Sequence, residues 1–264
     1  YEHCCRFLSR VSHSGPITRI MRAPSQMPHL PKQRRGAMTR DRVIAAAIET
    51  FGEEGLAKAR TRRVVERAGT NLVSIHYHFG SKDQLYCACA EHIARTIRDR
   101  STAVLDRGKA LVREPAASHR DLVECVCAIF DEFAGIGLSG GMPEGWRQFV
   151  VREQMEPTGT GAFELIFSSV RPFFDTVFGL AGRIIGRKPT DPEVRLLTTM
   201  IFGQISVFRT NQRGALKLMG WKRFGPKELA FIRMTARKYI VKLLADEPAR
   251  PPRARRPKRA APAV

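Results

Sequence analysis

The stretch NLVSIHYHFGSKDQLY, residues 71–86, constrains the fold more than any other part of the sequence. Ile75 and Phe79 are four residues apart, which places their side chains on one face of a helix. Asn71 is a favourable N-cap for that helix, and Gly80 stops it. An S-x-x-Q capping box then starts another helix at once. A helix this short, with His and Tyr side chains on its open face, indicates a helix whose outer side contacts another molecule.

Two more helices are predicted immediately before this stretch. The first covers residues 39–54, with Thr39 as its cap and Gly55 as its left-handed stop. Its apolar stripe consists of Ile44, Ala47, Ile48 and Phe51. Thr61 is expected to cap the second helix, which is short and ends at Gly69. Three helices with a tight turn between the last two match a helix-turn-helix, in which the last helix lies in the major groove of DNA.

Helical periodicity continues along most of the remaining chain. The helix that opens at Ser81 is expected to run to about Asp106. Later helices are expected over residues 118–134, 143–156, 162–186, 191–219 and 226–245. No strand pattern of comparable strength is present in the sequence. The predicted fold class is therefore all-α, with an N-terminal three-helix helix-turn-helix domain at residues 38–86 and a larger helical domain at residues 87–246.

The positive charge is concentrated at the two ends of the sequence. The formal net charge is +20, and residues 1–40 and 248–264 carry 13 of those charges. Residues 1–37 and 247–264 are rich in proline without sustained periodicity, so we expect a disordered basic leader and a disordered basic tail. Strong basicity favours a polyanionic partner such as nucleic acid or an anionic membrane. The middle of the chain is only moderately basic, so its partner has to be inferred from motifs.

Cysteine and histidine positions argue against several classes of site. The six cysteines lack the spacing of a small disulfide framework, and no run of 18 uncharged apolar residues occurs, which favours a soluble cytoplasmic protein without a membrane partner. Two pairs are interpreted as buried thiols rather than as a redox sensor between helices: Cys87 with Cys89, and Cys125 with Cys127. His76 and His78 point about 200° apart on a helix, so no metal site is predicted there. Since no nucleophile, acid–base pair or cofactor motif is present, neither an enzyme nor a cofactor is predicted.

The block VVERAGTNLVSIHYHFGSKDQLY resembles the DNA-binding signature of the tetracycline-repressor (TetR) family of bacterial transcription regulators. The shared features are the Ala-Gly turn, the aromatic-His-Phe ending of the short helix and the Ser-Lys that opens the next helix. The resemblance implies contacts with the DNA backbone from Thr61, Ser74, Tyr77 and Lys82. The candidates for base readout are Leu72, Val73 and His76. The sequence has His76 where the family usually has Tyr or Asn, and Val65 where Ala is commoner, so the base preference of the family does not transfer.

Three C-terminal stretches are similar to the ligand domain of a TetR subgroup typified by a bacterial regulator of sensitivity to certain antibiotics: VVREQMEPT, VRPFFDTVFGLAGRIIG and FGQISVFRTNQRGALKLMGW. This similarity implies a cavity, framed by the fourth to eighth helices, for an apolar or aromatic small molecule. Most aromatic side chains of this half are expected to fill the core. The predicted ligand-binding residues are Phe130, Phe149, Arg152, Glu153, Phe167, Phe174, Gln204 and Phe208.

The last helices carry apolar stripes that suit a partner subunit. In the final helix the stripe consists of Leu229, Ile232, Ala236, Ile240 and Leu243. As in the TetR family, two such helices from each subunit are expected to form a four-helix dimer seam, although an ordinary intrachain core fits the same pattern. The prediction is a homodimeric, ligand-responsive repressor that binds a palindromic operator at the nucleoid. Two alternatives remain open: a nonspecific nucleic-acid-coating protein that binds through its basic ends, and a helical enzyme that works in an aromatic cavity.

Overall fold

The computed structural model describes residues 32–138 and 143–245, with side chains described from Met38 onward. Within these ranges the chain is built of helices without a strand, which confirms the all-α class. The helices are α1 (Lys32–Lys58), α2 (Thr61–Ala68), α3 (Leu72–Phe79), α4 (Lys82–Arg113), α5 (His119–Gly137), α6 (Glu144–Met155), α7 (Ala162–Ile184), α8 (Pro192–Gly203), α9 (Ser206–Thr210), α10 (Gln212–Met219) and α11 (Pro226–Ala245). Most of the predicted leader and all of the predicted tail lie outside the described residues.

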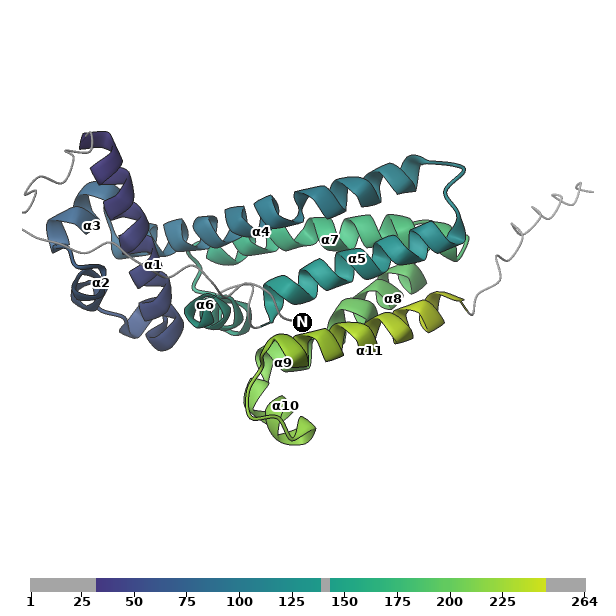
Figure 1. The fold of residues 1–264 in the computed structure, drawn as a ribbon. Helices are drawn as coiled ribbons and strands as arrows, with labels where there is room; N and C mark the ends of the chain where they lie inside the picture. Colours follow the sequence, from purple (N-terminus) through teal and green to yellow (C-terminus); the bar gives the residue numbers. More distant parts are fainter. Residues whose placement is uncertain (1–31, 139–142, 246–264) are drawn as a thin grey trace, which may run out of the picture.

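Helices α1 to α3 form a head at one end of an elongated helical body (Figure 1). From this head α4 runs along the length of the body, where its most extensive contact is with α7. Next to these two helices lies α5, which also packs against α11, while α9 and α10 project from the end of the body nearer the head. Buried apolar side chains form a core from Val43 in the head to Leu244 near the end of α11.

Three predictions about the N-terminal helices are wrong in detail. The first helix starts at Lys32, so Thr39 lies inside the helix and is not its cap. At Gly55 the backbone has φ 77° and ψ 164°, which kinks the helix rather than ending it, and the chain is helical again up to Lys58. Thr61 is the first helical residue of α2, and the N-cap position is held by Arg60, which makes no side-chain capping hydrogen bond.

Two later boundaries also differ from the prediction, because tertiary packing overrides local signals. Helix α4 continues past Asp106 to Arg113. A Cβ added at Gly108 would lie 2.5 Å from Cγ2 of Thr176, so this glycine permits close packing of α4 on α7. The single helix predicted over residues 191–219 is divided into α8, α9 and α10. The last of these has its own N-cap, since the Asn211 side chain accepts a hydrogen bond from the Gly214 amide at 3.1 Å.

Of the four cysteines that the structure describes, three are fully buried: Cys89, Cys125 and Cys127. This agrees with the interpretation as buried thiols, and burial raises the pKa of the Cys127 thiol to about 11. Cys87 is only half-buried, and its Sγ donates to the Thr160 carbonyl oxygen at 3.1 Å.

An aromatic cluster joins the head to the body. The Tyr86 ring of α4 packs edge-on against Phe51 of α1, with 5.0 Å between ring centroids, and stacks on Phe149 of α6 at 4.4 Å. The Tyr86 hydroxyl donates to Oε2 of Glu153 at 2.8 Å, while Oε1 of the same carboxylate accepts from the backbone amide and hydroxyl of Thr158. Both Tyr86 and Glu153 are buried, so the junction of α1, α4 and α6 has a polar centre whose hydrogen bonds are made.

Backbone contact between two glycines brings α6 against the head. A Cβ added at Gly52 of α1 would lie 2.4 Å from the carbonyl oxygen of Gly145, so these two backbones are closer than side chains would allow. Two turns further along α6, the Arg152 guanidinium donates to the carbonyl oxygens of Gly52 and Glu53 near the end of α1. The α1–α6 contact is the second most extensive between any two of the described helices, and it includes residues from Gly145 to Arg152 of α6.

We predict that Gly52→Ala destabilises the protein, because the added methyl group collides with the α6 backbone. Overpacking of this kind lowers the free energy of unfolding by about 1–3 kcal/mol. Urea unfolding at one protein concentration measures the change. The control is Gly203→Ala at the end of α8, where a Cβ meets no atom within 4 Å. That variant should be as stable as the wild type or slightly more so, and equal stability of both variants would contradict the close contact.

We also predict that Tyr86→Phe lowers the free energy of unfolding by about 1–3 kcal/mol, because it removes one donor from a buried carboxylate. The exposed Tyr239→Phe is the control and should leave the free energy of unfolding unchanged.

Burial, helped by Glu153, raises the pKa of Tyr86. The unfolded chain ionises this phenol near pH 10 whereas the folded chain keeps it neutral, so wild-type stability should fall as pH rises above about 10. Unfolding curves at pH 8 and 10.5 should show a smaller loss in Tyr86→Phe than in the wild type.

Candidate nucleic-acid interface and effector cavity

Helix α3 is short because its two ends are fixed by local chemistry. At its start the Asn71 side chain accepts a hydrogen bond from the Ser74 amide at 3.0 Å, as predicted. At its end Gly80 has φ 77°, and a Cβ there would lie 2.3 Å from Oε1 of Gln84. That glutamine belongs to the predicted capping box, in which the Ser81 hydroxyl accepts from the Gln84 amide and the Gln84 side chain accepts from the Ser81 amide. Thus α3 is followed at once by α4.

The two faces of α3 differ in the way that the sequence predicted. Ile75 and Phe79 are buried against α1, α2 and α4, which fixes the helix on the head. The opposite face is open, with Val73 72% exposed and Tyr77 82% exposed. Leu72 and His76 are exposed as well. An exposed valine, leucine and tyrosine in adjacent turns of a head that is otherwise strongly hydrophilic form a rim suited to contact with another molecule.

Three of the predicted backbone-contact residues are half-buried: Thr61, Ser74 and Lys82. The hydroxyl of Ser74 lies 2.8 Å from that of Thr70 and donates to the Asn71 side chain, so it is engaged in the turn between α2 and α3. Lys82 is the first residue of α4, and its Nζ donates to the carbonyl oxygen of Ala57 at 3.3 Å. A lysine has three N–H donors, so two of them remain for an anion.

His76 has a defined tautomer. Its Nδ1 lies 3.0 Å from the carbonyl oxygen of Gly80. A carbonyl oxygen can only accept, so Nδ1 carries the proton and donates. In the neutral ring Nε2 is then a hydrogen-bond acceptor.

Sequence reasoning missed the division of roles among the arginines of the head. Arg63 and Arg67 of α2 form ion pairs with Glu53, the former also with Glu54, so these cations hold α2 on α1. Arg60 is exposed and has no ion-pair partner among the described side chains. It stands next to Thr61 at the N-terminus of α2, where a helix favours anions. The sequence offered one signal for this role, which is the position of Arg60 directly before the predicted start of the second helix.

A small cavity of about 30 Å³ lies in the body among α4, α5, α6, α7 and α9. Its apolar walls are Ile97, Phe133, Ile136, Val150, Ile166, Val170 and Phe173. The polar side chains that line it are Arg147, Gln154 and Arg209. A space of this size holds about one water molecule. A ligand of ordinary size therefore fits only when the surrounding helices move apart.

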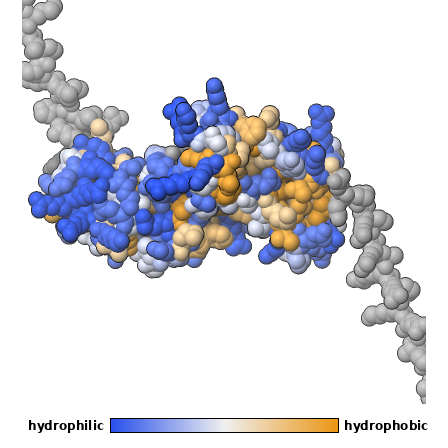
Figure 2. All heavy atoms as spheres, turned by 90° about the horizontal axis from the view of Figure 1, so that it is seen from below, coloured by the Kyte–Doolittle hydropathy of each residue, from blue (hydrophilic) through white to orange (hydrophobic). Residues whose placement is uncertain are grey.

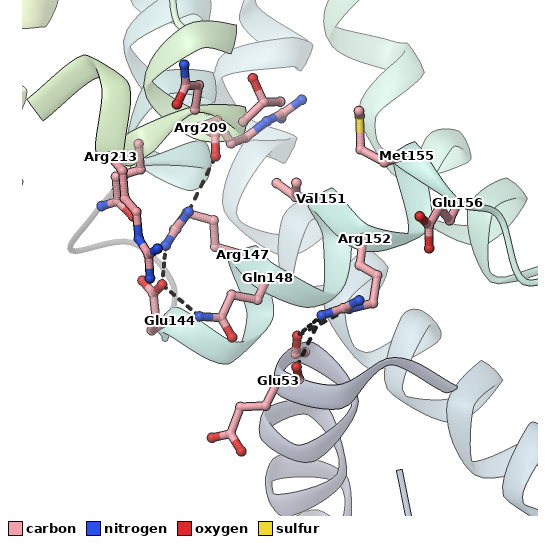
Figure 3. A pocket seen from close by; sticks show the side chains of 14 residues that line it. Glu53, Glu144, Arg147, Gln148, Val151, Arg152, Met155, Glu156, Arg209 and Arg213 are labelled. Atoms are coloured by element: carbon pink, nitrogen blue, oxygen red, sulfur yellow. Dashed lines mark hydrogen bonds and ion pairs between the residues drawn. The ribbon is translucent and has the colours of Figure 1, made fainter. Parts of the chain in front are cut away.

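An open groove of about 700 Å³ lies on the other side of Arg147 and Arg209 (Figure 3). It is bounded by α6, by the last part of α1, and by α9 and α10. Arg147 of α6 donates to the backbone carbonyl of Arg209 at 3.3 Å and forms an ion pair with Glu144. Arg152 reaches from α6 to the carbonyl oxygens of α1. Arg213 of α10 also lines this groove. The two arginines Arg147 and Arg209 thus separate an apolar cavity from a polar groove.

The eight residues predicted to bind a ligand do not come together in one cavity. Phe130, Phe149 and Glu153 are buried in the core, the last two at the head–body junction. Arg152 lines the open groove, whereas Phe167 and Phe174 line a shallow depression on α7 and α8. Phe208 packs on Trp221 and Phe224, and the neighbouring Gln204 is half-buried. Sequence reasoning therefore missed the residues that line the cavity, among them Phe133 and Phe173, which are two of the aromatic side chains of this half of the chain.

Neither a metal cluster nor a membrane-spanning helix is found in the described part of the chain. No three His, Cys, Asp or Glu side chains of residues 38–138 and 143–245 gather as ligands for one ion. Each described helix is too short or too polar to cross a bilayer.

Comparisons with known proteins agree with the head-and-body arrangement. The family described as "Bacterial regulatory proteins, tetR family" matches residues 43–89, and the "HTH-type transcriptional dual regulator CecR, C-terminal domain" matches residues 123–246. The HTH-type transcriptional dual regulator CecR of Shigella flexneri is 29% identical over 214 residues, which cover 78% of this chain and 91% of that protein. The HTH-type transcriptional repressor NicS of Pseudomonas putida is 38% identical over 55 residues, or 21% of this chain and 26% of that one.

A crystal structure of a TetR-like transcriptional regulator from Rhodococcus sp. RHA1 has the same fold. It aligns with a TM-score of 0.52 and 17% identity, over 83% of this chain and 100% of that chain. The two family matches fall on the head and the body, in the order that the sequence predicted, and the relatives are transcription regulators rather than enzymes. The chain therefore belongs to the TetR family of bacterial transcriptional regulators, with a C-terminal domain of the CecR type.

Proposed function

We propose that the chain is a repressor that binds a palindromic operator as a homodimer and releases it when a small apolar or aromatic effector enters the body. The exposed rim of α3 carries this proposal. Its buried face fixes the helix on the head, and its open face is free to enter a major groove, where base edges can be read. In this proposal Leu72, Val73 and His76 contact base edges. The backbone contacts come from Thr61, Ser74, Tyr77 and Lys82.

The tautomer of His76 determines which base groups it can hydrogen-bond in the proposed contact. With Nδ1 donating to Gly80, the acceptor Nε2 suits an amino group in the major groove. Adenine and cytosine present such a group there, whereas guanine and thymine present acceptors. We therefore expect His76 to favour adenine or cytosine at the position it reads.

The apolar stripe predicted for the final helix packs mainly inside the chain, where Ile232, Ala236 and Ile240 are buried. The proposed dimer uses instead the apolar side chains that α8 and α11 leave exposed. These are Leu196, Met200, Phe231, Met234, Tyr239, Val241 and Leu243. Figure 2 shows the body with apolar patches on the face seen from below, in contrast to the largely hydrophilic head. A set of large apolar side chains left exposed on two helices supports an interface with a second copy. Two-fold symmetry then presents two α3 helices to two half-sites of the operator.

The proposed switch is the movement of α6 when the cavity expands. One face of α6 lines the cavity through Val150 and Gln154, while Gly145 and Arg152 contact α1 of the head. An effector that enlarges the cavity displaces α6, and the glycine contact passes this displacement to α1. Operator release requires only that the effector bind the expanded arrangement more tightly than the closed one.

We predict that Lys82→Ala weakens binding to all DNA sequences and reduces the salt slope of binding by about 1, as expected for one lost phosphate contact. Gel-shift titrations at several salt concentrations, on DNA from beside the gene, measure both quantities. Lys109→Ala, on the same helix but far from the head, is the matched control and should leave both unchanged. An unaltered salt slope for Lys82→Ala would contradict its assigned contact.

We predict that His76→Ala, in contrast, reduces the preference for adenine or cytosine at one position of each half-site.

We predict that Met200→Glu combined with Met234→Glu converts the dimer to a monomer, because it buries like charges in the proposed seam. Sedimentation velocity measures the mass of the particle. Met38→Glu changes an equally exposed methionine of α1 and should leave the dimer intact. A double variant that still sediments as a dimer would rule out this seam.

A further inference from the structure

Arg209 is the most unusual charged residue of the body, because it lies in the wall of the apolar cavity without an anion to balance it. Its Nη2 donates to the neutral side chain of Gln154 at 3.2 Å. Its Nε is buried and has no hydrogen-bond partner among the described residues. No carboxylate of the described residues forms an ion pair with it. The guanidinium carbon lies 6.0 Å from the centre of the Phe133 ring, another wall of the cavity.

A half-buried cation whose Nε is buried without a partner carries an energetic cost that a ligand can remove. Burial lowers the pKa of the Arg209 guanidinium, which shows that the folded protein disfavours its charge. Arginine nevertheless stays protonated at neutral pH. A ligand anion that reached Nε would restore the missing hydrogen bond and neutralise the charge in a site of low dielectric, where such contacts are strong.

The surroundings of Arg209 restrict the shape of such a ligand. On one side are the apolar cavity walls, and on the other is the polar groove that Arg147 and Arg209 also line. The groove contains three carboxylates that would repel an anion: Glu53, Glu144 and Glu156. Two of them are engaged, since the carboxylate of Glu53 binds Arg63 and Arg67, and that of Glu144 binds Arg147. An anionic group is therefore best placed at Arg209, with its apolar part in the cavity.

We propose that the effector is an amphipathic monoanion, an apolar chain or ring with one carboxylate, whose carboxylate binds Arg209 while its apolar part enters the cavity. This inference rests on the proposed function, because it names the class of molecule that would release the operator. The cavity of about 30 Å³ is too small for such a molecule as it stands. Its entry must separate α6 from α5, α7 and α9, and α6 is the helix fixed to the head.

The test compares three probes that share one apolar chain and differ in charge: octanoate, 1-octanol and octylamine. Isothermal titration of the full chain at neutral pH measures their affinities. We expect octanoate to bind about tenfold or more tightly than octanol, which is the range for a hydrogen bond to a charged group, and octylamine to bind most weakly. Octanol binding as tightly as octanoate would overturn the inference. So would failure of all three probes to bind.

Arg209→Gln should remove the preference for octanoate over octanol, and Arg209→Lys should keep part of it. The matched control is Arg233→Gln. Arg233 also has a buried Nε without a partner, and it donates to the Asp131 carbonyl oxygen, but it lies between α11 and α5 away from the cavity. This control should keep the full preference. Octanoate binding of wild-type strength by a folded Arg209→Gln would refute the assignment, and if that variant does not fold, the ranking of the three probes on the wild type decides.

A gel shift with operator DNA separates this inference from the proposed function. Octanoate that binds the wild type and releases the operator supports both. If the operator is bound but octanoate shows no preference over octanol, the repressor proposal stands and the amphipathic monoanion is wrong. If octanoate binds through Arg209 but no operator binding is found, the cavity assignment holds and the proposed function fails.

Discussion

The junction of α1, α4 and α6 is the contact on which the rest of the molecule depends. Three rings, Phe51, Tyr86 and Phe149, pack there around a buried carboxylate whose two oxygens are both hydrogen-bonded. Because a buried carboxylate is costly without its donors, the three helices are held in one relative position. The backbone contact between Gly52 and Gly145 adds a steric limit to the same joint. Through this joint the orientation of α3 on the head is related to the packing of the body.

Helix α6 therefore packs differently on its two sides. Toward the head it is fixed by glycine contact and by Arg152, and toward the body it covers a cavity that is almost closed. In the proposed switch, this arrangement is what would let a small molecule that enters the cavity act on DNA binding without touching the DNA. The charge of Arg209 at the edge of this cavity has no balancing anion, which is the chemical reason for proposing an anionic rather than a neutral ligand.

The parts of the fold that the sequence revealed are those governed by local chemistry. Asn71, Gly80 and the Ser81 capping box act within a few residues of themselves, so the length and the buried face of α3 were predictable. The cap prediction at Thr39 failed because the helix begins earlier, at Lys32, and the one at Thr61 failed because Arg60 holds the N-cap position. Gly108 illustrates the general difficulty, since its role depends on Thr176, which is far away in sequence.

The cavity could not be predicted for the same reason. Its walls come from five helices, and an arginine within FGQISVFRT looks no different from a surface arginine until the helices are packed. Sequence reasoning recognised the aromatic character of this half but chose side chains that fill the core or line other surfaces. The family resemblance predicted a ligand cavity in the body, where a small cavity is found, whereas the identity of its lining side chains required the tertiary structure.

Hydrogen exchange of the full chain, with and without duplex DNA carrying the sequence beside its own gene, tests the central claim most directly. If α3 enters the DNA and α6 is joined to the head, amide exchange should slow in α3 and also in α6, which has no part in the DNA contact. Protection confined to α3 would contradict the joint between head and cavity. Unchanged exchange in α3 would contradict the interface itself.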